Sequence, residues 1–284
     1  MRGMEAKIHL KEEAKPKFCK ARPLPYALRE RVETEITRLV ELGIFEPVEV
    51  SNWAAPIVPI VKSDQSIRLC GDYKITVNQA TLLDNYPIPK GDDLFTLMTG
   101  GERFSKLDLS EAYTQMVLSS DSRECLTINT HKGLFQPTRL PYGVNSAPGI
   151  FQREMEKRLN GIPYTVVRID DILVSGRNDR EHLANLERVL KTIQESGLRL
   201  KRGKCKFLSP EVVYNGMLVH TQGISPVEEL VRAIKEAPQP TNISQLKSFL
   251  GMLNYYQRFI PDLSQVLEPL HRLLRKSQTW EWTG

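Results

Sequence analysis

Hydrophobic positions in the first half of the chain follow helical spacing once and strand spacing several times. A helix is predicted to open at Pro25, which suits a first helical turn, and to end at Gly43, which suits a C-cap. Short strands are predicted over residues 49–74, around a polar turn at 63–66. "RFSKLDL" alternates as a strand, and "CLTINTHKGLFQPTRL" is typical of a hairpin that turns at 131–133. The apolar face of the helix consists of Val32, Ile36, Leu39 and Val40.

The second half continues with two amphipathic helices on either side of an apolar hairpin. Pro148 is predicted at the first position of a helix, where its missing N–H is not needed. The hairpin follows at "TVVRIDDILVSG", and a second helix is predicted after it, ended by Gly197. The apolar faces of the two helices are Phe151, Met155 and Leu159, and then Leu183, Leu186, Val189, Leu190 and Ile193.

From Ser225 onward the pattern predicts helices only. Two capping-box patterns mark helix starts, and the first has Pro226 at its first helical position. Pro261 should stop the second helix, which leaves residues 263–274 for a third. An α+β body followed by a helical unit is therefore expected, with a boundary near residues 223–224. The two capping boxes are Ser225 with Glu228 and Asn242 with Gln245.

Composition excludes several classes of protein. Apolar residues make up 40% and charged residues 26% of the 284 residues, as in ordinary soluble globular proteins. The longest apolar stretch, "AAPIVPIV", is too short to span a bilayer, and the charged N-terminus lacks the apolar core of a signal peptide. The four cysteines never form C-x-x-C, so neither a zinc site nor a disulfide framework is supported. We expect an intracellular protein with a mobile N-terminal arm.

Positive charge is concentrated in one short segment. The net charge is +5 and the pI about 8.9, which favours a polyanionic partner only weakly. Residues 197–207 contain no acid and five basic side chains, which suits either a strand edge guarded by lysines or a nucleic-acid groove. The basic residues are Arg199, Lys201, Arg202, Lys204 and Lys206.

Two adjacent carboxylates, Asp170 and Asp171, interrupt the apolar hairpin. A hairpin turn explains them without any further function, because aspartate favours turns. A metal site at the hairpin tip is the alternative, and it needs a third carboxylate on a neighbouring strand. Asp108, near the end of "FSKLDL", is the best candidate. Three neighbouring carboxylates repel one another unless cations lie among them, and Mg²⁺ prefers such oxygen ligands.

Four ordered motifs resemble the reverse transcriptase of gypsy-type LTR retrotransposons, within the retroviral-type superfamily. "FSKLDLSEAY" matches the first aspartate motif of this family, and "RLPYGVNSAPGIFQREM" matches its L-P-x-G motif. "RIDDILV" lies where the family has Y-x-D-D, and "FLGMLNYYQRFIPDLS" is similar to its thumb signature. The resemblance runs from about residue 23 to 283 and favours the metal interpretation of the hairpin tip. It implies an RNA-directed DNA polymerase that uses two Mg²⁺ ions, for which Mn²⁺ can substitute.

The resemblance also implies roles for individual residues. Asp108, Asp170 and Asp171 would be catalytic metal ligands, helped by the backbone carbonyl of Leu109. Tyr113 would be the aromatic gate that excludes a ribose 2′-hydroxyl. The other implied nucleotide-binding residues are Lys62, Arg68, Tyr142 and Gly143, and the implied primer- or template-binding residues are Arg168, Lys201, Lys204, Lys206 and Gly216.

The implied fold is α+β: a right-hand polymerase with fingers, a ferredoxin-like palm and a helical thumb. Its partners would be deoxynucleoside triphosphates and an RNA or DNA template with its primer, without a membrane. The protein would be located in the cytoplasm, in a virus-like particle, or in the nucleus. It would originally be part of a polyprotein with protease, RNase H and integrase. The expected parts are a flexible arm (1–21), fingers (22–92 and 119–145), palm (93–118 and 146–224), thumb helices (225–275) and the start of a connection or RNase H region (276–284).

Two residues depart from the family pattern. Arg168 replaces the aromatic of Y-x-D-D, and Asn215 in "VYNGMLV" replaces a leucine of the primer-grip hairpin. Arg168 lies on the same strand face as Asp170 by the period of two. We expect it to pair with a catalytic carboxylate and compete with Mg²⁺, or else to reach a primer phosphate. The alternative function is an inactive relic or domesticated module that binds nucleic acid or protein; an RNA-templated RNA polymerase is disfavoured by Tyr113.

Overall fold

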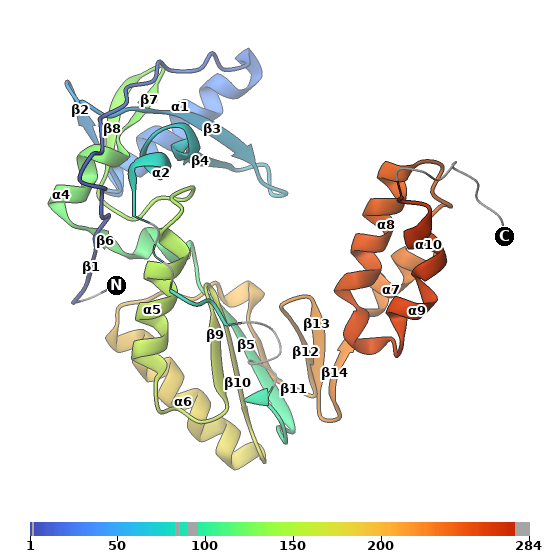
Figure 1. Ribbon diagram of the computed structural model, residues 1–284. Coiled ribbons are helices and arrows are strands. Elements are labelled where there is room, and N and C mark those ends of the chain that lie inside the picture. The colour runs from blue at the N-terminus through green and yellow to red at the C-terminus, as the bar shows by residue number, and fades with distance from the viewer. Residues whose placement is uncertain (2, 83, 85, 90–95, 276–284) are drawn as a thin grey trace.

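The computed structural model describes residues 1, 3–82, 84, 86–89 and 96–275. The expected boundary between fingers and palm at 92/93 and the segment 276–284 lie outside them. Figure 1 shows three bodies: a mixed α/β layer at the top, a sheet with two helices below it, and a helical unit to one side. The helical unit is joined to the rest through a small sheet, β12–β13–β14.

The central sheet has the strand order β11-β5-β10-β9, and every neighbouring pair is antiparallel. Along the chain these strands alternate with two helices in the order β5, α5, β9, β10, α6, β11. This is the split βαβ arrangement of ferredoxin-like folds, as expected for the palm. The elements are β5 (Arg103–Asp108), α5 (Ala147–Leu159), β9 (Thr165–Arg168), β10 (Asp171–Gly176), α6 (Asp179–Glu195), the short helix η4 (Arg202–Lys204) and β11 (Lys206–Ser209).

The upper layer is a five-stranded sheet of order β2-β8-β7-β3-β4, covered by α1. The predicted helix, the turn at 63–66 and the hairpin at 131–133 are confirmed. The elements are α1 (Tyr26–Glu41), β2 (Phe45–Val48), β3 (Ala55–Val61), β4 (Ile67–Gly71), η1 (Tyr73–Ile75), α2 (Val77–Ala80), η2 (Ala112–Gln115), β6 (Val117–Leu118), α4 (Ser120–Arg123), η3 (Glu124–Leu126), β7 (Ile128–Thr130) and β8 (Gly133–Pro137).

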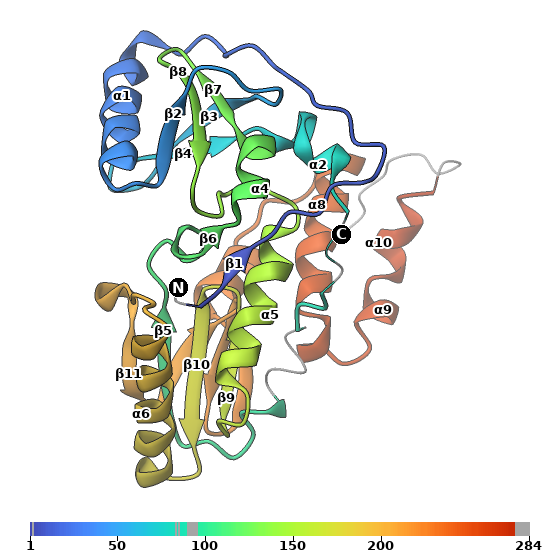
Figure 2. The same cartoon turned by 90° about the vertical axis from the view of Figure 1, so that its left-hand side faces the viewer.

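The N-terminal segment does not project as the mobile arm that its charge suggests. Strand β1 (Glu5–Ala6) pairs in parallel with β6, and the segment runs along the body beside α5 in Figure 2. Ala6 and Ile8 are 0% and 6% exposed. Alternating apolar residues within the charged stretch therefore hold it against the core, since burying them stabilises the contact.

The C-terminal third differs from the prediction at its start. Ser225 does not cap a helix, because β14 continues to Pro226 and pairs with β13. Helix α7 begins only at Glu228, with Val227 before it and no side-chain cap. Pro226 fits this edge strand because an edge position does not need its N–H. The elements are β12 (Glu211–Tyr214), β13 (Met217–His220), β14 (Gly223–Pro226) and α7 (Glu228–Lys235).

Asn242 caps the second helix as predicted, although the Gln245 side chain accepts from the Thr241 N–H and not from that of Asn242, and the helix predicted over 263–274 is divided. The Asn242 side chain accepts a hydrogen bond of 3.0 Å from the Gln245 N–H at the start of α8 (Ile243–Tyr255). After η5 (Gln257–Phe259), α9 (Leu263–Val266) and α10 (Glu268–Arg272) replace the third helix. Pro269 explains the break, because proline cannot continue the hydrogen bonding of a preceding helical turn.

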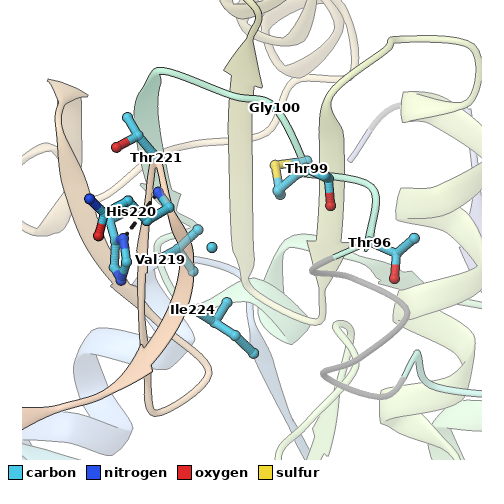
Figure 3. A pocket seen from close by; sticks show the side chains of 10 residues that line it. Thr96, Thr99, Gly100, Val219, His220, Thr221 and Ile224 are labelled. Carbon is cyan, nitrogen blue, oxygen red and sulfur yellow. Dashed lines mark hydrogen bonds between the residues drawn. The ribbon is translucent and has the colours of Figure 1, made fainter.

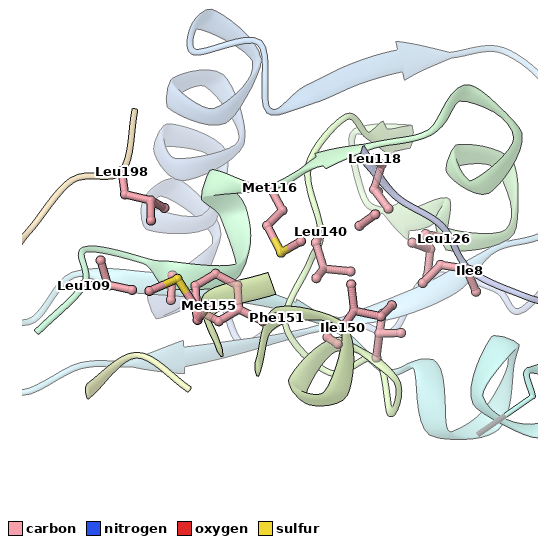
Figure 4. Close-up of a cluster of buried hydrophobic side chains, with 14 of the residues drawn as sticks. Ile8, Leu109, Met116, Leu118, Leu126, Leu140, Ile150, Phe151, Met155 and Leu198 are labelled. Atoms are coloured by element: carbon pink, nitrogen blue, oxygen red, sulfur yellow. The ribbon is translucent and has the colours of Figure 1, made fainter. Parts of the chain in front are cut away.

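One hydrophobic core joins the upper layer, the N-terminal segment and the palm helices, as Figure 4 shows around Met116, Leu140, Phe151 and Met155. A second core lies between the central sheet and β12–β14, and a third lies among the C-terminal helices. Leu183, predicted on the buried face of α6, is 49% exposed, and His182 and Asn185 are buried in its place. His182 Nε2 lies 2.8 Å from the Ser105 hydroxyl oxygen, and the Asn185 side chain donates to the Ser175 carbonyl at 3.0 Å, which sequence periodicity does not reveal.

Candidate functional site

Two of the three carboxylates lie side by side on the central sheet. Asp108 ends β5 and Asp171 begins β10, and they are direct cross-strand partners. Arg168, the last residue of β9, is the partner of Asp171 on the other side. Cross-strand partners have Cα atoms about 4.5–5.5 Å apart and share a face of the sheet. The three side chains therefore form one row across the sheet, and Asp170 lies in the turn beside it.

The turn between β9 and β10 has an unusual backbone. Ile169 has a φ of +57°, which is unfavourable for a β-branched side chain. Gln152 of α5 supports it, because its side-chain oxygen accepts the Ile169 N–H at 2.7 Å and its amide donates to the Val167 carbonyl at 2.8 Å. Leu109 donates its N–H to the Asp170 carbonyl at 2.9 Å. Strain of this kind is maintained at functional sites by surrounding contacts.

Two lysines neutralise the carboxylates. Lys106 Nζ lies 3.1 Å from Asp171 Oδ1, and Lys204 Nζ lies 3.6 Å from Asp108 Oδ2. Burial raises the pKa of Asp171, while Lys106 opposes this increase and the charges of Asp170 and Asp108 add to it. Lys106 was missed by the sequence reasoning, although its position two residues before Asp108 on the same strand face could have indicated it.

Among the residues that the structure describes, no three His, Cys, Asp or Glu side chains are arranged to hold a metal ion as they stand. The donors nevertheless suit Mg²⁺, because they are carboxylates on adjacent backbone positions whose mutual repulsion requires cations. In the structure the ammonium groups of Lys106 and Lys204 meet that requirement. A metal site shared by the three carboxylates stays a prediction.

Three aromatic rings and an arginine lie next to the carboxylates. The Tyr113 ring is 5.1 Å from Tyr142 and 5.6 Å from Phe151, measured between centroids. Arg68 lies over the Tyr142 ring at 4.6 Å, and its Nε is buried without a hydrogen-bond partner in the described part of the chain. Burial raises the pKa of Tyr113 to about 12, and the charge of Asp170 adds to this. Arg68, Tyr142, Tyr113 and Asp170 are thus neighbours.

Gly143 and Lys62 have structural partners nearby. Gly143 has a φ of +97°, and a Cβ there would lie 2.9 Å from the Gly71 carbonyl oxygen, so both conformation and space require glycine. Lys62 Nζ lies 3.8 Å from Glu111 Oε1, which links the upper layer to the segment after Asp108.

The basic segment fits parts of both interpretations given for it. Strand β11 is an edge strand of the central sheet, with Lys206 exposed and in register with Lys106. Lys204 reaches Asp108, whereas Lys201 contributes its backbone N–H to the Asp108 carbonyl at 2.8 Å. The segment therefore supports the end of β5 as well as exposing positive charge.

Arg168 does not pair with a carboxylate, contrary to our expectation. Its Nη1 donates to the side-chain oxygen of Asn215, and within the described residues it forms no ion pair. The reason is geometric: the turn of Asn215 and Gly216 between β12 and β13 lies against the end of β9. The two residues that depart from the family pattern therefore contact each other.

A separate cavity of about 400 Å³ lies between residues 96–100 and the β13–β14 turn. Figure 3 shows Thr96 and Thr99 on one side and Val219, His220 and Thr221 on the other. None of the residues assigned to the carboxylate site lines it.

No helix within the described residues combines the length and apolarity that a membrane crossing demands.

Comparisons with known proteins agree with the fold and the motifs. The reverse transcriptase (RNA-dependent DNA polymerase) family matches residues 60–219, which are 160 of the 284 residues. The uncharacterized protein K02A2.6 of Caenorhabditis elegans is 36% identical over 92% of this chain and 21% of its own length. The transposon Tf2-3 polyprotein of Schizosaccharomyces pombe is 29% identical over 100% of this chain and 21% of its own length. The chain thus spans about one fifth of the curated relatives it matches.

Solved structures confirm the α+β polymerase fold. A foamy viral protease-reverse transcriptase in complex with double-stranded DNA superposes with a TM-score of 0.86 at 25% identity, over 97% of this chain and 50% of that one. The same kind of protein in complex with an RNA/DNA hybrid gives a TM-score of 0.81 at 25% identity, over 97% of this chain and 38% of that one.

Proposed function

Since the chain belongs to the reverse transcriptase family, we propose that it is the polymerase core of an RNA-directed DNA polymerase. It would add deoxynucleotides to the 3′ end of a primer on an RNA or DNA template. The observation that carries the proposal is the row of Asp108 and Asp171 on adjacent strands, with Asp170 in the strained turn beside them.

Asp108, Asp170 and Asp171, with the Leu109 carbonyl, would hold two Mg²⁺ ions. When bound, two such ions activate the attacking 3′-hydroxyl and stabilise the leaving pyrophosphate. The protein contributes the rigid sheet that fixes the carboxylates and the lysines that neutralise them. Lys106 must leave Asp171, and Lys204 must leave Asp108, before either carboxylate can bind a metal fully. Mn²⁺ would serve in the same site because it accepts oxygen ligands.

The residues beside the carboxylates would bind the incoming nucleotide. Arg68 suits a triphosphate because its planar guanidinium donates to two phosphate oxygens at once, and its Nε is buried without a protein partner among the described residues. Tyr113 would lie against the sugar and exclude a 2′-hydroxyl, held by its contacts with Tyr142 and Phe151. Gly143 would allow close approach of the backbone, and Lys62 would add a positive charge.

Template and primer would be bound mainly through phosphates. The two foamy viral structures, described as complexes with double-stranded DNA and with an RNA/DNA hybrid, support a duplex as the partner. Lys201, Lys204 and Lys206 would contact the duplex with the thumb helices, and Gly216 would lie near the primer. Binding of this kind weakens steeply with salt and does not depend on sequence. We further propose that the activity belongs to a longer polyprotein that also carries protease, RNase H and integrase.

Primer extension tests the proposal. The assay uses RNA and DNA templates, each with deoxynucleotides and with ribonucleotides. We expect extension on both templates with deoxynucleotides and little with ribonucleotides. Extension with ribonucleotides only would identify an RNA polymerase. Duplex binding without extension under any condition would identify an inactive, nucleic-acid-binding relic.

A further inference from the structure

Two tight turns meet beside the carboxylates. One is the strained turn at Ile169 and Asp170. The other is formed by Asn215 and Gly216, with φ values of +50° and +75°, and joins β12 to β13 where Tyr214 pairs with Met217. A two-residue hairpin turn of this type requires positive φ at both positions, and Asn-Gly is the favoured pair. The shape of the second turn is therefore fixed by its own sequence.

The β12–β13 hairpin is attached to β9 and to β10 by one hydrogen bond each. Arg168 donates from Nη1 to the side-chain oxygen of Asn215, and the Tyr214 hydroxyl donates to the Asp171 carbonyl at 3.3 Å. Arg168 is also the cross-strand partner of Asp171. One contact is thus made to Asp171 itself, a proposed metal ligand, and the other to its cross-strand partner Arg168.

The same turn is attached to the thumb on its other side. The hydroxyl of Tyr255, at the end of α8, donates to the Asn215 carbonyl at 3.2 Å. A Cβ on Gly216 would lie 2.7 Å from the Tyr255 hydroxyl oxygen, so the tyrosine lies directly on the turn. Asn215 consequently accepts one hydrogen bond from the palm through its side chain and one from the thumb through its backbone.

We propose that Arg168 is a positioning residue that fixes the Asn215-Gly216 turn, and through Tyr255 the thumb helix α8, relative to Asp171. Its charge is used in a hydrogen bond to a neutral amide, which leaves the carboxylates free of competition from this guanidinium. A duplex held against α8 then lies at a defined distance from the metal ligands. The consequence for DNA synthesis rests on the proposed function, whereas the consequence for the turn does not.

The test compares Arg168→Met with Arg188→Met, which removes an exposed arginine of α6 whose bond goes to the Gly161 carbonyl. Amide hydrogen exchange is measured over residues 214–217 and α8, and the affinity for a fixed template–primer is measured by direct titration. We expect Arg168→Met to speed exchange in both segments about tenfold and to weaken duplex binding about tenfold, as loss of a charge-assisted hydrogen bond predicts. Arg188→Met should change neither.

Asn215→Gly provides an independent variant if Arg168→Met fails to fold, because glycine keeps the turn while removing the acceptor. It should reproduce the faster exchange, and Asn215→Asp should keep exchange slow because a carboxylate also accepts from Arg168. In an active enzyme, Arg168→Met should raise KM for template–primer more than it lowers kcat. Exchange over residues 214–217 equal to that of Arg188→Met would overturn the proposal. Because exchange and affinity need no catalysis, they test it even if extension fails.

Discussion

Replacing Lys106 with methionine tests how the carboxylates are stabilised. The ammonium lies 3.1 Å from Asp171 Oδ1, and the two side chains are 22% and 30% exposed. At this distance the gross attraction is about 5 kcal/mol for an effective dielectric constant of about 20. Solvent screening of the partly exposed pair and the cost of desolvating both charged groups make the net contribution of this ion pair much smaller. We therefore expect Lys106→Met to lower the free energy of unfolding by about 1–2 kcal/mol. Methionine retains most of the apolar stem.

The assay is equilibrium denaturation of Lys106→Met and Lys206→Met, with and without excess Mg²⁺. Lys206 is the register neighbour of Lys106 but is exposed, so its replacement should cost little. Mg²⁺ should recover more stability in Lys106→Met than in the wild type, because a cation at the carboxylates then replaces the missing ammonium. Equal losses in the two variants would refute the reasoning, as would a Lys106→Met protein that gains nothing from Mg²⁺.

Three further predictions concern other residues. Burial lowers the pKa of His182, so the folded protein resists protonation of this side chain. The free energy of unfolding should therefore decrease as the pH falls below the unfolded pKa of about 6.5, by at most about 1.4 kcal/mol per pH unit from this group. In denaturation experiments between pH 7.5 and 5.5, His182→Gln should make the unfolding free energy depend less on pH. Gly143→Ala should lower the melting temperature more than Gly133→Ala. Both positions have positive φ, but only at Gly143 would the added Cβ lie 2.9 Å from a carbonyl oxygen, so equal shifts would contradict this. Tyr113→Val should increase ribonucleotide incorporation relative to deoxynucleotide incorporation in primer extension, and an unchanged ratio would argue against a gate at this position.

Much of the fold followed from local patterns. Proline and glycine at the ends of α1 and the alternation of β5 were sufficient because local chemistry and tertiary packing agree there. The prediction that Ser225 caps a helix was wrong because the same sequence fits both a capping box and an edge strand ending in proline. Pairing with β13 decides in favour of the strand. The N-terminal segment was expected to be mobile because its charges conceal the buried Ala6 and Ile8.

The sequence predicted that Asp108 lies beside the Asp170–Asp171 pair, and the structure pairs Asp108 with Asp171, but the contacts around these carboxylates were less predictable. The ordered motifs identified Asp108, Asp170 and Asp171 through resemblance. The partner of Arg168 could not be predicted, because Asn215 is 47 residues away and only the packing of β12–β13 against β9 brings the two together. Gln152 was missed for a similar reason, since it acts from a helix on a turn 17 residues away. Lys106 was missed although its place on the strand face of Asp108 indicates it.

The rate of single-nucleotide addition on an RNA template tests the central claim most directly. The wild type is compared with Asp108→Asn, Asp170→Asn and Asp171→Asn across a range of Mg²⁺ concentrations, with template–primer affinity measured in parallel. If the three carboxylates form one metal site, the wild type extends the primer and each variant loses at least about a thousandfold in rate. The affinity of each variant for template–primer should be nearly that of the wild type, and for all four proteins it should fall steeply as the salt concentration rises. A variant that extends at the wild-type rate, or a wild type that binds duplex but never extends it, would contradict the account.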